Sequence, residues 1–150
     1  MSILIYAEYA EGKFKKAAFE LASYAKKVAE SLGTTVTAVT INAGDVSELS
    51  KYGVDKVLKV NNDELSGFTA KAYADVIKQA AQKENIKLLL LSSTTDSVYL
   101  SSLVAVALEA GYASNVVGLP VSTSPFQVKR TAFSNKAFMI TEINTDVKVL

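Results

Sequence analysis

Residues 3–7 read Ile-Leu-Ile-Tyr-Ala, a continuous apolar run of the length of a β-strand. A strand that is apolar at every position is typical of a parallel sheet whose two faces are both covered by helices. The run ends at the charged residue Glu8. We therefore predict that residues 3–7 form the central strand of such a sheet.

The segments that follow alternate between helix and strand patterns. Apolar residues recur with helical spacing over residues 14–32, 69–84 and 96–110. Strand patterns occupy residues 36–41, 57–60 and 88–91. Asp45 is placed to cap a short helix that ends near Tyr52, and Asp96 is placed to cap the last of the three longer helices. This alternation predicts an α/β, doubly wound, mainly parallel sheet.

The pattern changes after Gly111, where helical spacing gives way to strand-like segments. These segments are residues 116–121, 127–133, 136–143 and 147–150, with short turns between the later ones. We predict that they form a C-terminal antiparallel hairpin or meander. No linker, repeat or change in composition divides the chain, so residues 1–150 are expected to form a single domain.

Composition narrows the classes of function. The chain has 150 residues, of which 49% are hydrophobic and 21% charged, and its sixteen basic and fifteen acidic residues leave a net charge of +1. Nucleic acid and anionic lipid favour a strongly basic surface, so neither is expected as a partner. Histidine and cysteine are absent. Thiolate or imidazole metal sites, disulfides and Ser-His or Cys-His catalytic pairs are therefore excluded.

Targeting and membrane segments are not indicated either. The start of the sequence lacks a basic leader, and its apolar run stops at Glu8, which is too early for a signal peptide. The apolar run at residues 103–108 is far shorter than the roughly 18 residues of a membrane-spanning helix. We expect a cytoplasmic protein that does not insert into membranes.

One loop has the composition of an anion-binding site. Ser92, Ser93, Thr94 and Ser97 follow the strand at residues 88–91 and open the next helix. Hydroxyl groups and free N–H groups at a helix N-terminus can receive a phosphate. The spacing is similar to the Ser-Gly-Gly-x-Asp-Ser loop of ATP pyrophosphatases, but Ser93 and Thr94 replace the glycines that let a backbone approach a pyrophosphate. A polar helix cap is the alternative interpretation.

Two carboxylates, Glu8 and Asp96, follow strands at the same predicted edge of the sheet. Together they could perform acid–base chemistry or hold a divalent metal ion. The alternative is that each is a solvated loop residue, because the neighbouring sequence supplies neither with a matched partner. The Gly-x-Gly-x-x-Gly and Walker fingerprints are absent. We assign no catalytic residue and expect no enzymatic activity from this chain.

The helix expected at residues 96–110 is apolar around most of its circumference. Its apolar residues include Val98, Leu100, Leu103, Val104, Val106 and Leu108. Such a helix is either buried on several sides or in contact with another subunit. We consider burial the simpler interpretation.

Four short segments carry a resemblance to a known family. They are Ile3-Leu4-Ile5-Tyr6-Ala7-Glu8-Tyr9, the Gly-Val-Asp-Lys-Val-Leu segment at residues 53–58, Lys129-Arg130-Thr131-Ala132-Phe133 followed by Ala137, and Asp146-Val147-Lys148-Val149-Leu150. In this order they resemble the N-terminal domain of the electron transfer flavoprotein alpha subunit. The resemblance covers nearly the whole chain and implies a three-layer fold like that of the adenine nucleotide alpha hydrolases.

The resemblance also implies where subunits meet. Candidate contact positions are Leu103 in the apolar helix and Arg130, Asn135 and Lys136 in the C-terminal hairpin. The sequence departs from the family at several of these places. Ser101-Ser102-Leu103 stands where the family has Ala-Pro-Arg, and Asn135-Lys136 stands where it has Gly-Asn. Asn135 can still adopt the left-handed conformation that the hairpin turn needs.

A function follows from this resemblance as an expectation. The chain would be a non-catalytic scaffold domain that pairs with a beta subunit in a heterodimer, which carries electrons from flavin-dependent dehydrogenases to an acceptor. FAD would be held mainly by a C-terminal domain of the alpha subunit that this sequence does not include, so no cofactor is expected here. None of the side chains can cycle electrons, which agrees with this expectation. The alternative is a stand-alone adenine-nucleotide-binding module with phosphate at Ser92–Ser97.

Overall fold

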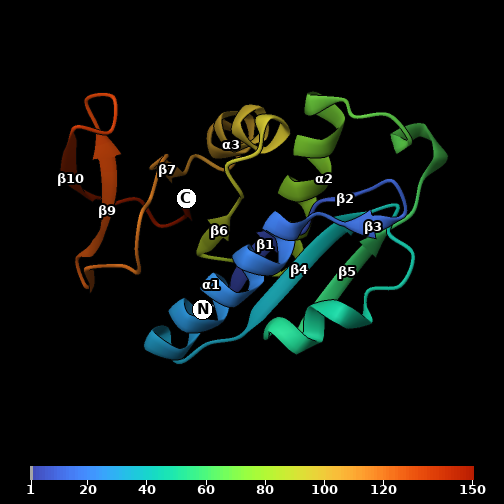
Figure 1. Cartoon of the computed structure of the whole chain (residues 1–150), viewed down its shortest axis with the longest axis horizontal. Helices are drawn as coiled ribbons and strands as arrows, with labels where there is room; N and C mark the ends of the chain where they lie inside the picture. The colour runs from blue at the N-terminus through green and yellow to red at the C-terminus, as the bar shows by residue number, and fades with distance from the viewer. Residues whose placement is uncertain (1) are drawn as a thin grey trace.

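A computed structural model describes residues 2–150, and its centre is a six-stranded sheet with the order β5-β4-β1-β6-β11-β7. Every neighbouring pair in this sheet is parallel. The strands are β1 (Ile3–Tyr6), β4 (Val36–Ile41), β5 (Lys56–Val60), β6 (Leu88–Leu90), β7 (Gly111–Tyr112) and β11 (Lys148–Val149). The predicted central strand is confirmed, since β1 lies inside the sheet between β4 and β6 (Figure 1).

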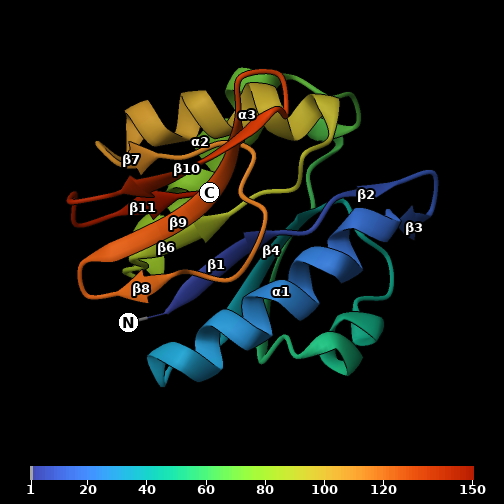
Figure 2. The same ribbon diagram turned by 60° about the vertical axis from the view of Figure 1, so that its left-hand side comes forward.

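Helices cover both faces of the sheet, which gives three layers (Figure 2). On one face lies α1 (Lys16–Leu32), and on the other lie α2 (Ala70–Lys83) and α3 (Thr95–Ala107). Two short 3₁₀ helices, η1 (Ser47–Tyr52) and η2 (Asp63–Leu65), complete the connections. Side chains of β1 alternate between the two cores, with Ile3 and Ile5 toward α1 and Leu4 and Tyr6 toward α2 and α3. The α/β class is therefore confirmed.

Two smaller sheets are attached to this body. A hairpin of β2 (Tyr9–Ala10) and β3 (Lys13–Phe14) returns the chain directly after β1. An antiparallel sheet contains β8 (Ser122–Thr123), β9 (Phe126–Ala132) and β10 (Ala137–Glu142), in the order β10-β9-β8. The hairpin of β9 and β10 lies at one end of the molecule in Figure 1, and β10 forms a free edge of its sheet.

The predicted C-terminal antiparallel hairpin is confirmed, because β9 and β10 pair in that way, but two other segments of the predicted meander differ. Residues 147–150 do not continue the antiparallel sheet, because β11 inserts between β6 and β7 in the parallel sheet, where Val149 is fully buried. The sequence of a short apolar strand is compatible with parallel and with antiparallel pairing. The path of the chain before the strand decides which pairing forms. Residues 116–121 form no strand; a single bridge joins Val116 to Arg130. Pro120 has no N–H to donate to a ladder, which disfavours a regular strand here.

Two local features also differ from the sequence prediction. The β2–β3 hairpin was not expected, and it turns at Glu11 and Gly12, which both have positive φ. The predicted short helix after Asp45 does form and ends at Tyr52, but it is the 3₁₀ helix η1 and its N-terminal cap position is Val46; Asp45, before it, accepts a hydrogen bond from the Ser47 N–H at 2.9 Å. In the part of the chain that the structure describes, we found no helix with the length and hydropathy needed to cross a membrane.

Gly33 ends α1 in the left-handed conformation, with φ of 60°. A side chain there meets no neighbour within 4 Å, so the cost of Gly33→Ala is conformational. We expect this substitution to lower the free energy of unfolding by about 1 kcal/mol in urea denaturation. Gly67→Ala is the matched control, because Gly67 also has open space around it and lacks a positive φ. An equal effect of both substitutions would contradict the prediction.

Candidate functional site

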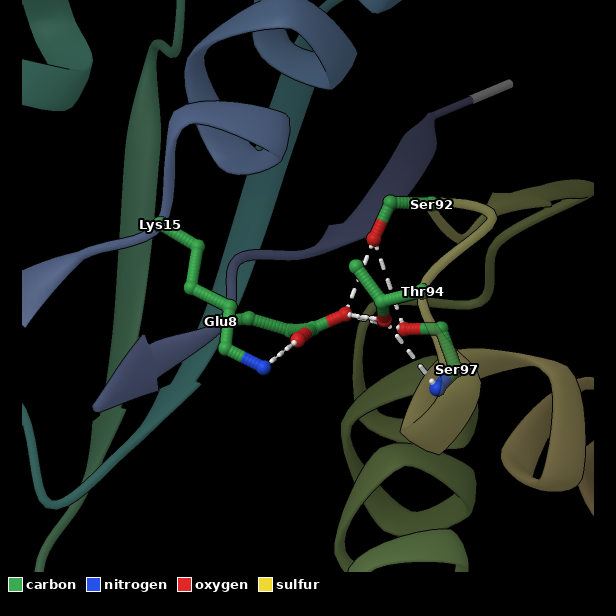
Figure 3. Close-up of polar contacts among 5 residues, drawn as sticks. All are labelled: Glu8, Lys15, Ser92, Thr94 and Ser97. Atoms are coloured by element: carbon green, nitrogen blue, oxygen red, sulfur yellow. Dashed lines mark hydrogen bonds and ion pairs between the residues drawn. The ribbon is translucent and has the colours of Figure 1, made fainter.

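The carboxyl ends of β1 and β6 meet at one edge of the sheet because the two strands are parallel neighbours. Glu8 follows β1 at this edge, and the loop from Ser92 to Thr94 leads from β6 into α3. Figure 3 shows the Glu8 side chain pointing at this loop. Glu8 is almost fully buried, with 3% of its surface exposed. This carboxylate is the centre of the candidate site.

Four side chains donate hydrogen bonds to the Glu8 carboxylate (Figure 3). Lys15 Nζ lies 2.7 Å from Oε2 and forms an ion pair with it. The other oxygen, Oε1, accepts from Ser92 Oγ at 2.9 Å, from Ser97 Oγ at 2.5 Å and from Thr94 Oγ1. We call Lys15, Ser92, Thr94 and Ser97 the Glu8 cradle. Both carboxylate oxygens therefore have partners.

Local backbone structure brings the cradle together. The β2–β3 hairpin turns the chain back after Glu8, so that the Lys15 N–H also donates to the Glu8 carbonyl at 3.0 Å. On the other side, Thr94 is the N-terminal cap of α3 and accepts from the Ser97 N–H at 3.3 Å. That cap holds Ser97, which is fully buried, against Glu8. The cap was predicted at Asp96, which instead lies in the first turn of α3.

The cradle keeps the carboxylate charged. Burial acts to raise the pKa of Glu8, but the hydrogen bonds from Lys15 and the three hydroxyls outweigh it and hold the pKa below its usual value. The hydrogen bond to Glu8 in turn raises the pKa of Lys15. At neutral pH the site is thus a buried carboxylate with a partly exposed ammonium. The carboxylate and the ammonium therefore form an ion pair.

The candidate site residues from the sequence divide into two groups. Ser92, Thr94 and Ser97 do converge, but on Glu8. Ser93 is exposed and lines, with Ser92 and Thr94, a cleft of about 430 Å³ beside α1. The interpretation of Glu8 as a solvated loop residue is wrong, because the β2–β3 hairpin supplies the partner that was missing. Lys15 was not singled out, although the Glu11-Gly12 turn could have indicated that the chain returns to Glu8.

A metal site at Glu8 and Asp96 gains no support. Among residues 2–150, no three carboxylates gather closely enough to hold a metal ion. Glu8 is also already neutralised by Lys15, and its lone pairs accept hydrogen bonds from the cradle. The arrangement suits structural stabilisation of the sheet edge.

The helix α3 is not buried on all sides. Its residues Leu100, Val104 and Ala105 lie in the core, and the other face is exposed. We call this exposed face, which includes the candidate contact residue Leu103, the α3 surface; its members are Val98, Tyr99, Leu103 and Val106. Exposed apolar side chains gathered on one helix face are typical of a contact with another protein.

A second exposed apolar surface lies on the C-terminal hairpin. We call the exposed apolar residues of this hairpin the hairpin surface; they are Phe133, Phe138, Met139 and Ile140, and along β10 Phe138 and Ile140 point to one side of the strand and Met139 to the other. Phe133 is 80% exposed and Phe138 is 64% exposed, and Lys129 Nζ lies 4.1 Å from the centre of the Phe138 ring. The sequence analysis missed these apolar residues. Their signal was the run Ala137-Phe138-Met139-Ile140, which does not alternate with polar residues as a half-buried strand does.

The other three candidate contact residues lie beside the hairpin surface. Asn135 has φ of 62° in the hairpin turn, as its side chain allows, and Lys136 beside it is exposed. Arg130 lies on β9, and its Nη2 donates to Ser114 Oγ at 3.1 Å. Its Nε is buried and lacks a hydrogen-bond partner among the described residues.

A family model matches this chain over nearly its full length. The model is described as "Electron transfer flavoprotein domain" and matches residues 3–150. Among curated proteins, the chain is 29% identical over 121 residues to "Protein FixB" of Clostridium saccharobutylicum, covering 79% of the chain and 36% of that protein. It is 32% identical over 123 residues to "Electron transfer flavoprotein subunit alpha" of Thermoanaerobacterium thermosaccharolyticum, covering 79% and 37%.

A longer match has lower identity. The chain is 27% identical over 148 residues to "Lactate dehydrogenase (NAD(+),ferredoxin) subunit LctC" of Acetobacterium woodii, covering 95% of the chain and 35% of that protein. The chain thus spans little more than a third of the length of these relatives.

Proposed function

The chain belongs to the electron transfer flavoprotein domain family, and from this premise we propose that it is a non-catalytic scaffold and subunit-interaction domain. Its partner is a beta-type subunit, with which it forms a heterodimer in the cytoplasm. The complete assembly takes electrons from flavin-dependent dehydrogenases and passes them to an acceptor. The observation that carries the proposal is the family match over residues 3–150.

The cradle does not suit a pyrophosphate, which supports a site for the flavin elsewhere in the assembly. FAD contains a pyrophosphate, which binds at helix N-termini with free N–H and hydroxyl donors. At the N-terminus of α3 the hydroxyls of Ser92, Thr94 and Ser97 already donate to Glu8. A pyrophosphate there would also meet the negative charge of Glu8. This supports a role in which the domain gives shape and contacts, and another segment binds FAD.

The two exposed apolar surfaces support the subunit-interaction part of the proposal. Protein interfaces typically have a core of aromatic and aliphatic side chains with arginine nearby. The hairpin surface has this composition, with Phe133 and Phe138 close in sequence to Arg130. The strand β10 also has a free edge in its sheet, where main-chain groups are open to a partner. We place the beta-subunit contact on the hairpin surface and the α3 surface.

Complex formation tests this proposal. The chain is co-expressed with an electron transfer flavoprotein beta-type subunit encoded in the same genome, and the mixture is separated by size exclusion. We expect one peak that contains both chains in equal amounts. Two separate peaks, each at the size of its own chain, would contradict the proposed heterodimer.

The stand-alone nucleotide module is the alternative that this proposal replaces. It needs the Ser92–Ser97 loop to be open to phosphate, whereas the Glu8 carboxylate accepts hydrogen bonds from three of its hydroxyls. Isothermal titration with AMP and ATP separates the two functions. Micromolar binding of either nucleotide to this chain would favour the module.

A further inference from the structure

The strand β10 lies at the free edge of its sheet, at an outer end of the molecule (Figure 1), and its sequence is complementary to itself. Residues 136–142 read Lys-Ala-Phe-Met-Ile-Thr-Glu. We propose that β10 pairs antiparallel with β10 of a second copy of this chain, about a two-fold axis at Met139. In this register Lys136 faces Glu142 of the other copy, and Phe138 faces Ile140. The pairing joins two three-stranded sheets into one.

The main-chain groups of β10 alternate in the way that this register requires. Successive residues of an antiparallel strand direct their N–H and C=O groups to opposite sides of the strand. The Ile143 N–H donates to the Phe126 carbonyl at 3.0 Å, so the odd-numbered residues of β10 face β9. The N–H and C=O groups of Phe138, Ile140 and Glu142 therefore face the free edge. These are the positions that exchange hydrogen bonds when Phe138 pairs with Ile140 of the other copy.

The apolar side chains of β10 match across the proposed axis. Phe138 and Ile140 lie on the same side of the strand, and both are more than half exposed. An aromatic side chain opposite a β-branched one stabilises an antiparallel pair of strands. The two-fold axis forms this pair twice, because each copy supplies one Phe138 and one Ile140.

The charged residues at the two ends of β10 fix the direction of the pairing. Lys136 directly precedes the strand and Glu142 ends it, and both are exposed. Among residues 2–150, neither forms an ion pair within its own chain. Glu142 accepts a hydrogen bond from the neutral Gln127 side chain at 2.9 Å. Antiparallel pairing places a lysine opposite a glutamate at both ends, whereas in-register parallel pairing places like charges together.

The edge strand β5 of the central sheet provides a contrast. It carries the exposed residues Lys56 and Lys59, and lysines on an edge strand disfavour pairing with another strand. On β10 the residues from Ala137 to Thr141 carry no charge. A contact about a two-fold axis uses the same edge of both copies, so it closes at a dimer and does not continue into a fibre.

This inference goes beyond the proposed function, because it concerns the chain in the absence of a beta-type subunit. The second copy occupies the hairpin surface on which we place that subunit, so the two partners compete for it. The self-pairing is tested with this chain alone, and the heterodimer is tested with both chains. Failure of one test therefore leaves the other standing.

Sedimentation equilibrium of the purified chain tests the dimer. We expect the mass to rise from 16.0 kDa toward twice that value as the concentration is raised through the micromolar range. Ile140→Pro removes an N–H from the free edge and spares the ladder to β9, a position where an edge strand tolerates proline. We expect this variant to keep its circular dichroism spectrum and to remain a monomer. A wild type that stays at 16.0 kDa, or a folded Ile140→Pro variant that dimerises as the wild type does, overturns the proposal.

Charge reversal tests the register. Lys136→Glu and Glu142→Lys each place like charges opposite one another at both ends of the paired strands, so we expect each variant alone to dimerise at least about tenfold more weakly. An equal mixture of the two variants is expected to recover the wild-type affinity, because each end of a mixed pair then joins an acidic and a basic side chain.

The matched control is Lys83→Glu, which makes the same change of charge at an exposed residue that ends α2. We expect this variant to dimerise as the wild type does. The proposed pairing is overturned if the mixture of Lys136→Glu and Glu142→Lys dimerises no better than either variant alone. It is also overturned if Lys83→Glu weakens the dimer as much as Lys136→Glu.

Discussion

Replacing Glu8 by glutamine is expected to lower the free energy of unfolding at pH 7 by about 3 kcal/mol. Breaking a buried ion pair typically costs 3–5 kcal/mol, since the remaining groups stay desolvated without a partner. The lower end applies here because the Lys15 side chain is 39% exposed and can turn to solvent. Glutamine keeps the shape of Glu8, so the decrease in unfolding free energy comes from the lost charge and hydrogen bonds and not from a cavity. Urea denaturation followed by circular dichroism measures it.

The control is Glu20→Gln, which removes a carboxylate that is 66% exposed and lies 3.5 Å from Lys16. Exposed ion pairs contribute from almost nothing to about 1 kcal/mol, so this change should be small. A loss below about 0.5 kcal/mol for Glu8→Gln, or losses of equal size for both variants, would show that the cradle does not stabilise the fold.

The effect of Glu8→Gln should also depend on pH. The pKa of Glu8 is lower in the folded chain than its usual 4.5, so the folded state favours the charged form. The stability that Glu8 contributes is therefore fully present above pH 4.5 and is lost as the pH falls through the folded pKa. We expect the difference in unfolding free energy between wild type and Glu8→Gln to be constant near neutral pH and to shrink in acid. A difference that grows in acid would contradict this account.

Replacing Phe138 by aspartate is expected to weaken the complex with the beta-type subunit at least about thirty-fold. Interface residues at hot spots contribute about 2 kcal/mol or more, and aromatic residues are prominent among them. Phe138 is 64% exposed in the free chain, so the substitution should leave the fold intact. Titration calorimetry of the purified subunits measures the affinity. Leu103→Asp on the α3 surface is a second, independent probe of the contact.

A matched control for Phe138→Asp is Phe68→Asp. Phe68 is also an exposed aromatic residue, but it precedes α2, where its ring packs against Tyr73. We expect the control to keep its affinity for the partner. An unchanged affinity of both Phe138→Asp and Leu103→Asp would remove the two surfaces from the proposed interface.

The parallel body of the fold follows from the sequence because its strands are apolar at successive positions. The apolar runs at residues 3–7 and 88–91 are buried on both faces of the sheet. A run of this kind is typical of a parallel strand that helices cover on both sides. Residues 147–150 carry a similar pattern, but their two-residue strand could join either sheet. Its place is decided by its parallel pairing with β6. This contact is between residues far apart in sequence, so the local pattern of apolar residues does not predict it.

The hydroxyl loop and the place of Glu8 at the same sheet edge could be predicted from the sequence, whereas the hydrogen bonds between them could not. Helix-start patterns show where Ser92, Thr94 and Ser97 stand, since they depend only on neighbours in sequence. The partner of these hydroxyls, Glu8, lies more than eighty residues away, and the ammonium of Lys15 reaches it through a hairpin of two-residue strands. Such short strands carry almost no periodic signal. The composition of the loop alone therefore suggested a bound anion, where the anion is the Glu8 carboxylate of the chain itself.

We propose that this domain contributes structure and contacts while the flavin is bound elsewhere in the assembly. The sharpest test of this proposal is the visible absorption spectrum of the purified chain, together with the amount of flavin released on denaturation. We predict a colourless protein that releases no stoichiometric flavin. A yellow protein that retains one flavin per chain through purification would contradict the claim.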